Sequence, residues 1–182
     1  MNKRNIPVGV SDFSEIRQND YYYVDKSELI RELLKTSIAK VTLITRPRRF
    51  GKTLAMSMLA NFFDIRQKNE SLFQGLAVSS DSSFCKEWMN QWPVVFLALK
   101  NIDGLTFSTA YQQLAYEIGL LFEKHKYLLT DEKIGPAEKE LFERLKNRSA
   151  SEVEVSRSLQ FLLQLMTQHY GTSYCVEVML AQ

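Results

Sequence analysis

The 182-residue sequence has little cysteine, little histidine and little net charge, and each shortage excludes a class of protein. It contains two cysteines, Cys85 and Cys175, and two histidines, His125 and His169. Cysteines this few and this far apart make neither a disulfide framework nor a metal-ligand spacing, which is typical of a reducing compartment. A net charge of +2 gives no broad electrostatic reason to bind nucleic acid. We interpret both histidines as helix-surface residues.

Long apolar runs are also missing. No stretch approaches the roughly 18 consecutive apolar residues that a membrane-spanning helix needs. The first residues, MNKRNIPVGVSDF, lack the apolar segment of a secretory signal peptide. We therefore expect a cytoplasmic protein with no membrane partner. The length predicts one domain, or one and a fraction.

The most informative stretch is VTLITRPRRFGKTLAMSML, residues 41–59, where an apolar run leads into a basic loop and then a helical pattern. Strand, loop and helix around Gly-Lys-Thr is the layout of a P-loop, or Walker A motif. The usual spacing has a first glycine where this chain has Arg46. Pro47 fixes its own φ and restricts the residue before it, so we expect the Arg-Pro pair to make the same turn.

This loop supplies the predicted nucleotide-binding residues. Backbone N–H groups at a helix N-terminus bind phosphate, and Gly51 lets the backbone approach closely. Lys52 reaches the β and γ oxygens, and the Thr53 hydroxyl is a ligand for Mg²⁺ held with the nucleotide. ATP and Mg²⁺ are thus the expected cofactors. The full set is Arg46, Pro47, Arg48, Arg49, Phe50, Gly51, Lys52 and Thr53. The alternative is a chance tripeptide between a strand and a helix.

The spacing of apolar residues predicts the order of elements. We expect an irregular start, a short extended piece at YYYVDKS, turns around SLFQGL, and a short helix at CKEWMNQW. Buried strands separated by helices indicate an α/β fold with a mostly parallel sheet flanked by helices. The predicted strands are 41–45 and 93–99, and the predicted longer helices are 28–36, 53–64, 106–126, 136–148 and 151–170.

These residues carry a family resemblance. RPRRFGKT after an apolar strand resembles the P-loop of the bacterial AAA-ATPase-like family. Upstream, IPVGVSDF and YYYVDKS are similar to that family's P-x-G-x-x-D-F and Y-Y-V-D-K-[ST] elements, and LFQGL and WPVVFLALK match further segments. The resemblance covers about residues 6–171 and leaves a divergent tail, 172–182. It implies that residues 1–182 are an ATP-binding domain of the P-loop NTPase-like type.

The resemblance weakens at the C-terminus. Family members place an acidic Walker B strand after an HYG-like turn, and longer members usually carry a domain similar to PD-(D/E)XK nucleases. Here HYG is followed by TSYCVEVMLAQ, which contains no Asp-Glu pair. We interpret Glu177 as a surface residue of an edge strand, rather than as a displaced Walker B acid. We therefore expect a fold that is incomplete at the C-terminus, and poor ATP hydrolysis.

Accessory residues and a second function complete the predictions. Asp25 and Lys26 match a family motif and are predicted near the nucleotide, although a helix cap and a solvated lysine fit equally well. Asp103 follows the second predicted strand, where open α/β sheets bind ligands. The alternative to an ATP-binding domain is a non-enzymatic module whose basic loop binds anionic partners such as nucleic acid. Nucleic acid is also the expected partner of any nuclease-like domain.

Overall fold

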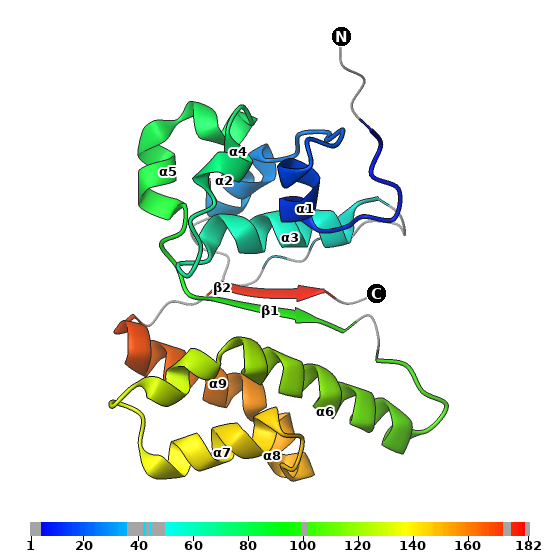
Figure 1. Cartoon of the computed structure of the whole chain (residues 1–182), viewed down its shortest axis with the longest axis vertical. Helices are drawn as coiled ribbons and strands as arrows, with labels where there is room; N and C mark the ends of the chain where they lie inside the picture. The colour runs from blue at the N-terminus through cyan, green and yellow to red at the C-terminus, as the bar shows by residue number, and fades with distance from the viewer. Residues whose placement is uncertain are drawn as a thin grey trace. The chain divides into compact units, whose positions relative to one another are not determined.

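The computed structural model describes residues 5–35, 42, 44, 50–99, 102–172 and 176–180, the last range as backbone alone after Val176. The chain divides into two compact units, Met1–Trp92 and Pro93–Gln182, which we call unit 1 and unit 2 and describe separately. Figure 1 traces both units along the chain.

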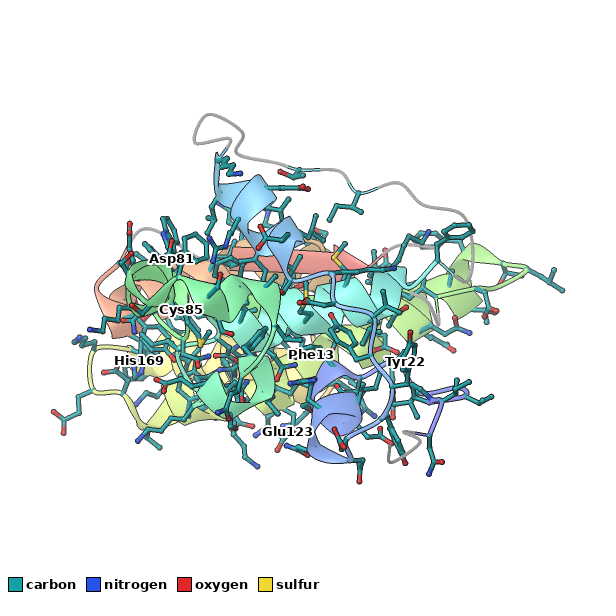
Figure 2. The ribbon with its side chains drawn as sticks, turned by 90° about the horizontal axis from the view of Figure 1, so that it is seen from above. Phe13, Tyr22, Asp81, Cys85, Glu123 and His169 are labelled. Carbon is teal, nitrogen blue, oxygen red and sulfur yellow. The ribbon has the colours of Figure 1, made fainter. Side chains whose placement is uncertain are left out.

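Unit 1 is helical in its described part, and local hydrogen bonds fix where its helices begin. The Asp12 carboxylate accepts the Glu15 N–H at 2.9 Å and caps α1. Asp81, which Figure 2 labels, caps α5 in the same way. Gly51 precedes α3. The elements are α1 Phe13–Gln18, α2 Glu28–Lys35, α3 Lys52–Phe63, α4 Glu70–Phe73, the 3₁₀ helix η1 Ala77–Ser80, and α5 Ser82–Trp88.

Phenylalanine rings form the centre of unit 1. Phe13 of α1 lies 4.9 Å from Phe73 of α4, and Phe73 lies 5.3 Å from Phe62 of α3, measured between ring centroids. All three side chains are fully buried. Since ring pairs at these distances add to the hydrophobic gain of burial, the three rings join α1, α3 and α4 into one core.

Unit 2 pairs two strands and covers them with helices. β1 and β2 run parallel, with Val94 opposite Val176 and Ala98 opposite Leu180. Helix α6 packs against β1, and α7 packs against α6 (Figure 1). The elements are β1 Val94–Ala98, α6 Phe107–Lys124, the 3₁₀ helix η2 Lys126–Thr130, α7 Pro136–Lys146, α8 Glu152–Ser156, α9 Ser158–Tyr170, and β2 Val176–Leu180.

The core of unit 2 is apolar and continuous from strand to helices. Val95 and Leu97 of β1 belong to the same buried cluster as Phe122 of α6, Phe142 of α7 and Leu162 of α9. The rings of Phe122 and Phe142 lie 4.8 Å apart, edge to face. In unit 2, therefore, helices pack as one layer against the two-stranded sheet of β1 and β2.

The predicted fold class is wrong. Across the described ranges helices dominate, and the strands are only β1 and β2, paired with each other in a two-stranded sheet. This is not a P-loop NTPase-like, mostly parallel sheet flanked by helices. The predicted strand 41–45 lies outside the described residues except for Thr42 and Ile44, which have no regular secondary structure. The physical reason is that strands form a sheet only where distant segments pair, and in the described ranges β1 has β2 as its partner while the helices of unit 2 bury the rest of that core.

Individual elements agree better with their predictions. The helices expected near 28–36, 53–64, 106–126 and 136–148 are confirmed, as is a strand within 93–99. Residues 1–20 contain the unexpected helix α1, and α4 overlaps the start of SLFQGL. The predicted helix 151–170 is two helices, α8 and α9, separated at Arg157.

The interpretation of the histidines as helix-surface residues is wrong for His125. Its side chain is 1% exposed, and its Nδ1 lies 2.9 Å from the Leu121 carbonyl oxygen. His169 is half-buried, and its Nδ1 lies 2.6 Å from an Asp131 carboxylate oxygen (Figure 2). Both rings therefore have structural partners within unit 2.

Candidate functional site

The first turn of α3 lies at the predicted Gly-Lys-Thr. Gly51 has φ of +77°, in the left-handed region, and its carbonyl accepts the Ala55 N–H at 2.9 Å as the first hydrogen bond of the helix. Lys52 and Thr53 are the first two helical residues. By helix geometry the N–H groups of residues 52–54 have no acceptor within the helix, so they are available to an anion. Phe50 is 62% exposed, and Arg46, Pro47, Arg48 and Arg49 lie outside the described residues.

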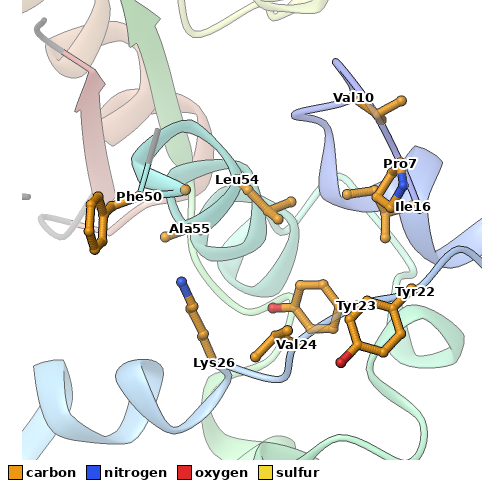
Figure 3. A pocket seen from close by; sticks show the side chains of 11 residues that line it. Pro7, Val10, Ile16, Tyr22, Tyr23, Val24, Lys26, Phe50, Leu54 and Ala55 are labelled. Atoms are coloured by element: carbon orange, nitrogen blue, oxygen red, sulfur yellow. The ribbon is translucent and has the colours of Figure 1, made fainter. Parts of the chain in front are cut away.

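The charges at this helix start have the sign that attracts an anion. The first turn of α3 contains no acidic residue and begins with Lys52. The Lys26 ammonium nitrogen lies 3.6 Å from the position that a Cβ on Gly51 would occupy. Figure 3 shows the Lys26 side chain directed at α3, where Ala55 lies. A helix N-terminus already carries partial positive charge, so cations beside it are unfavourable unless an anion is bound there.

Lys26 is held in place by its neighbours in YYYVDKS. The Asp25 carboxylate accepts the N–H of Ser27 at 2.8 Å and that of Ala77 at 2.7 Å. The buried Ser27 hydroxyl accepts the Val78 N–H at 3.0 Å. These bonds tie the segment to η1, and Asp25 and Ser27 also fix the chain at the start of α2. Lys26, between these anchored residues, is thereby directed to Gly51.

The pKa of Asp25 agrees with this anchoring role. Partial burial by itself raises the pKa of a carboxyl group, but here the N–H groups of Ala77 and Ser27 hold the pKa of Asp25 below its ordinary value. The ionised carboxylate of Asp25 is therefore the form that these hydrogen bonds stabilise. The structure places Asp25 beside the candidate site as a support for Lys26.

Two cavities of unit 1 meet at Gly51. The first, which we call the Tyr22 cavity, has a volume of about 390 Å³, and its lining includes Tyr22, Val24 and Leu54. The second, the Glu32 cavity, has a volume of about 360 Å³ and is lined by Lys52 together with Glu28 and Glu32. Lys26, Phe50, Gly51 and Ala55 line both. The start of α3 therefore borders both hollows, and the Glu32 cavity adds the side chains of Glu28, Glu32 and Lys52 to residues that the two share.

The donor set fits a polyphosphate better than a free metal ion. Among residues 51–53 and Lys26, ammonium groups, main-chain N–H groups and one threonine hydroxyl suit phosphate oxygens, and of these groups the Thr53 hydroxyl suits Mg²⁺. In the part of the chain that the structure describes, no group of three or more His, Cys, Asp or Glu side chains is placed to hold a metal ion.

The structural role of the P-x-G-x-x-D-F element was missed by sequence reasoning. Gly9 has φ of +78°, and Asp12 caps α1 and accepts a hydrogen bond from the Ser57 hydroxyl of α3 at 3.3 Å. The Phe13 N–H donates to the same hydroxyl oxygen at 3.0 Å. The sequence did contain a helix-start pattern, because Asp12 followed three residues later by Glu15 is typical of the first turn of a helix.

The third accessory residue, Asp103, belongs to unit 2. It is exposed ahead of α6, and its N–H donates to the Gln113 side-chain oxygen at 2.6 Å. Its predicted role at the nucleotide stays a prediction.

Comparisons with known proteins agree with the resemblance drawn from the motifs. A sequence family described as "Predicted AAA-ATPase" matches residues 7–176, so the chain belongs to this AAA-ATPase-like family. An Azotobacter chroococcum mcd 1 protein, described as "Uncharacterized protein in vnfD 5'region", is 36% identical over 96 residues, which cover 52% of this chain and 17% of that protein. The match thus spans under a fifth of that relative's length. No solved structure matches the chain.

None of the helices in the described ranges combines the length and the apolar composition that a bilayer crossing requires.

Proposed function

We propose that this chain binds ATP, as its Mg²⁺ complex, at the start of α3. The observation that carries the proposal is the pairing of a left-handed Gly51 with two ammonium groups, those of Lys52 and Lys26, at a helix N-terminus that has no acid in its first turn. Membership of a family described as predicted AAA-ATPases supports ATP as the anion.

Each residue has a role in this proposal. The N–H groups of the first turn of α3 donate to phosphate oxygens, and Gly51 lets the backbone approach them because it has no Cβ. Lys52 and Lys26 neutralise phosphate charge, and the Thr53 hydroxyl coordinates the Mg²⁺ that accompanies the nucleotide. Arg46, Arg48 and Arg49 of the same basic loop are proposed to add positive charge around the phosphates.

Lys52→Ala provides the test. We predict that it lowers affinity for Mg-ADP by at least about a hundredfold, because a charge-assisted contact to phosphate and its share of the neutralised charge are both lost. Isothermal titration calorimetry measures the two affinities. Lys68→Ala is the matched control, since Lys68 is an exposed lysine of the same unit outside either cavity lining.

The calorimetry also separates the alternative, a basic loop that binds any anion. Mg²⁺ raises the affinity for ADP if Thr53 completes the coordination of the ion. A simple basic patch is expected to bind ADP no more tightly when Mg²⁺ is present. Equal Mg-ADP affinity in wild type and Lys52→Ala contradicts the proposal. Binding that is unchanged by removal of Mg²⁺ favours the anion-binding module.

A further inference from the structure

We propose that the Tyr22 cavity binds the nucleoside of the bound nucleotide, an inference that rests on the function proposed above. The cavity is bounded by residues 7–16, 22–26 and 50–55 (Figure 3). Its volume of about 390 Å³ lies in the range of roughly 300–1,000 Å³ usual for small-molecule sites. Because Gly51 and Lys26 line this cavity as well as the Glu32 cavity, a nucleotide with its phosphates at Gly51 extends its sugar and base directly into it.

The chemistry of the walls suits a purine base and a ribose. One side presents the ring of Tyr22 and the side chain of Val24, and the other presents Leu54 and Ala55 of α3 (Figure 3). Aromatic rings stack on bases, and apolar side chains cover the opposite face of the base. Lys26 marks the border of this region, where the nucleoside ends and phosphate begins.

The exposed apolar side chains of unit 1 also indicate a ligand site at the Tyr22 cavity. Six large apolar side chains are exposed in the described part of unit 1, and four of them belong to the segments around this cavity, Ile6 and Ile65 being the exceptions. Tyr22 is 57% exposed and Val24 is 58% exposed. A gathering of exposed apolar groups around a hollow indicates a ligand site, since a bound ligand removes them from water. The four are Val8, Tyr22, Val24 and Phe50, and the last three line the cavity itself.

The walls are held in position without a ligand. The Tyr22 N–H donates to the Asn5 carbonyl oxygen at 2.9 Å, which fastens the N-terminal segment beside residues 22–24. The Tyr23 hydroxyl donates to the Met58 sulfur at 3.3 Å, and the Tyr23 ring packs edge to face on Phe13. These contacts join the first wall to α1 and α3. A cavity fixed in this way binds its ligand without first being ordered.

The experiment compares two probes, Mg-ADP and Mg-tripolyphosphate, on the same protein variants. Tripolyphosphate has the anionic part of the ligand and no nucleoside. We predict that Tyr22→Ala weakens Mg-ADP by about tenfold or more, the usual loss of one base-stacking contact, and changes Mg-tripolyphosphate less than twofold. Tyr21→Ala is the matched control, because Tyr21 is the adjacent tyrosine and does not line the cavity. It is predicted to change neither affinity.

The outcomes separate this inference from the proposed function. Equal wild-type affinities for the two probes overturn the nucleoside site and leave the phosphate site standing. If Tyr22→Ala loses binding of both Mg-ADP and Mg-tripolyphosphate, the nucleoside site is also overturned. The effect of the substitution would then come from damage to the fold and not from a lost contact to the base. Failure of wild type to bind either probe overturns the proposed function, and this inference with it.

A second measurement uses the unaltered protein. 8-Azido-ADP is predicted to label peptides from residues 7–16 or 22–26 on irradiation, and excess Mg-ADP is predicted to suppress the labelling. Labelling confined to other segments overturns the assignment.

Discussion

Lys26 sits where its charge is unfavourable for stability and useful for binding. Its ammonium lies near Gly51 at the positive end of α3, and a like charge at a helix terminus has an effect of about 0.3–1 kcal/mol at an exposed site. We predict that Lys26→Met raises the melting temperature of the nucleotide-free protein and reduces the further rise that Mg-ADP produces. Thermal unfolding with and without Mg-ADP measures both shifts.

Lys68→Met is the control for the loss of one positive charge. It is expected to change neither the melting temperature of the nucleotide-free protein nor the further rise that Mg-ADP produces. A Lys26→Met protein that melts at a lower temperature without nucleotide, with an undiminished response to Mg-ADP, contradicts an electrostatic role at the site.

Gly51 has a conformation that other residues reach only with strain. Its φ of +77° equals that of Gly75, and neither glycine has a neighbour that would clash with a Cβ. A residue with a Cβ loses about 1–2 kcal/mol in the left-handed region. Gly51→Ala and Gly75→Ala are therefore predicted to lower the free energy of unfolding by similar amounts.

The two glycine variants should differ in function. Only Gly51→Ala is expected to weaken Mg-ADP, since its methyl group lies where phosphate approaches the backbone. Chemical denaturation and calorimetry on both variants provide the comparison. An equal loss of nucleotide affinity in both would mean that the loss reflects general destabilisation.

At the level of elements, the start of α8 is an acid-sensitive feature of unit 2. Glu154 accepts a hydrogen bond from Arg144 of α7 at 2.6 Å and one from the Ser151 N–H at 2.8 Å. The Arg144 guanidinium first, and the Ser151 groups next, lower the pKa of Glu154 from 4.5 to about 2. Stabilisation by Glu154 is therefore complete above about pH 4.5 and is lost as the pH falls towards 2.

We predict that Glu154→Gln lowers the melting temperature at pH 7 and makes it fall less steeply between pH 5 and pH 3. The control is Glu152→Gln, which removes a charge from the same helical turn but not from the bond to Arg144. Parallel pH profiles for wild type and Glu154→Gln would contradict this role.

At the level of the whole molecule, the 182 residues are predicted to turn ATP over at a rate near background. Hydrolysis needs an acid that positions Mg²⁺ and water, and the acid of β2 is Glu177 alone. The sequence has an Asp-Glu pair at 131–132, but it follows a 3₁₀ helix. The Lys133 N–H and His169 hold the pKa of Asp131 low. A phosphate-release assay tests this, and robust turnover lost in Glu177→Gln would contradict it.

The sequence by itself determined the local features. Gly51 and the apolar spacing of 54–63 place the start of α3, and Asp81 and Ser151 place the starts of α5 and α8 through bonds to residues two or three positions away. These features were predictable, or visible as capping patterns, because the interacting groups are neighbours in the chain. The family also follows from short motifs, which the match over residues 7–176 confirms.

The tertiary structure decided what depends on distant residues. Lys26 lies beside Gly51 because Asp25 and Ser27 bind main-chain groups of residues 77 and 78, about fifty positions along the chain. The Tyr22 cavity exists because Asn5, Tyr22 and α3 meet. The predicted sheet failed for the same reason. Strand pairing joins segments far apart in the sequence, and β1 has β2, about eighty positions further along, as its partner in a two-stranded sheet of the described residues.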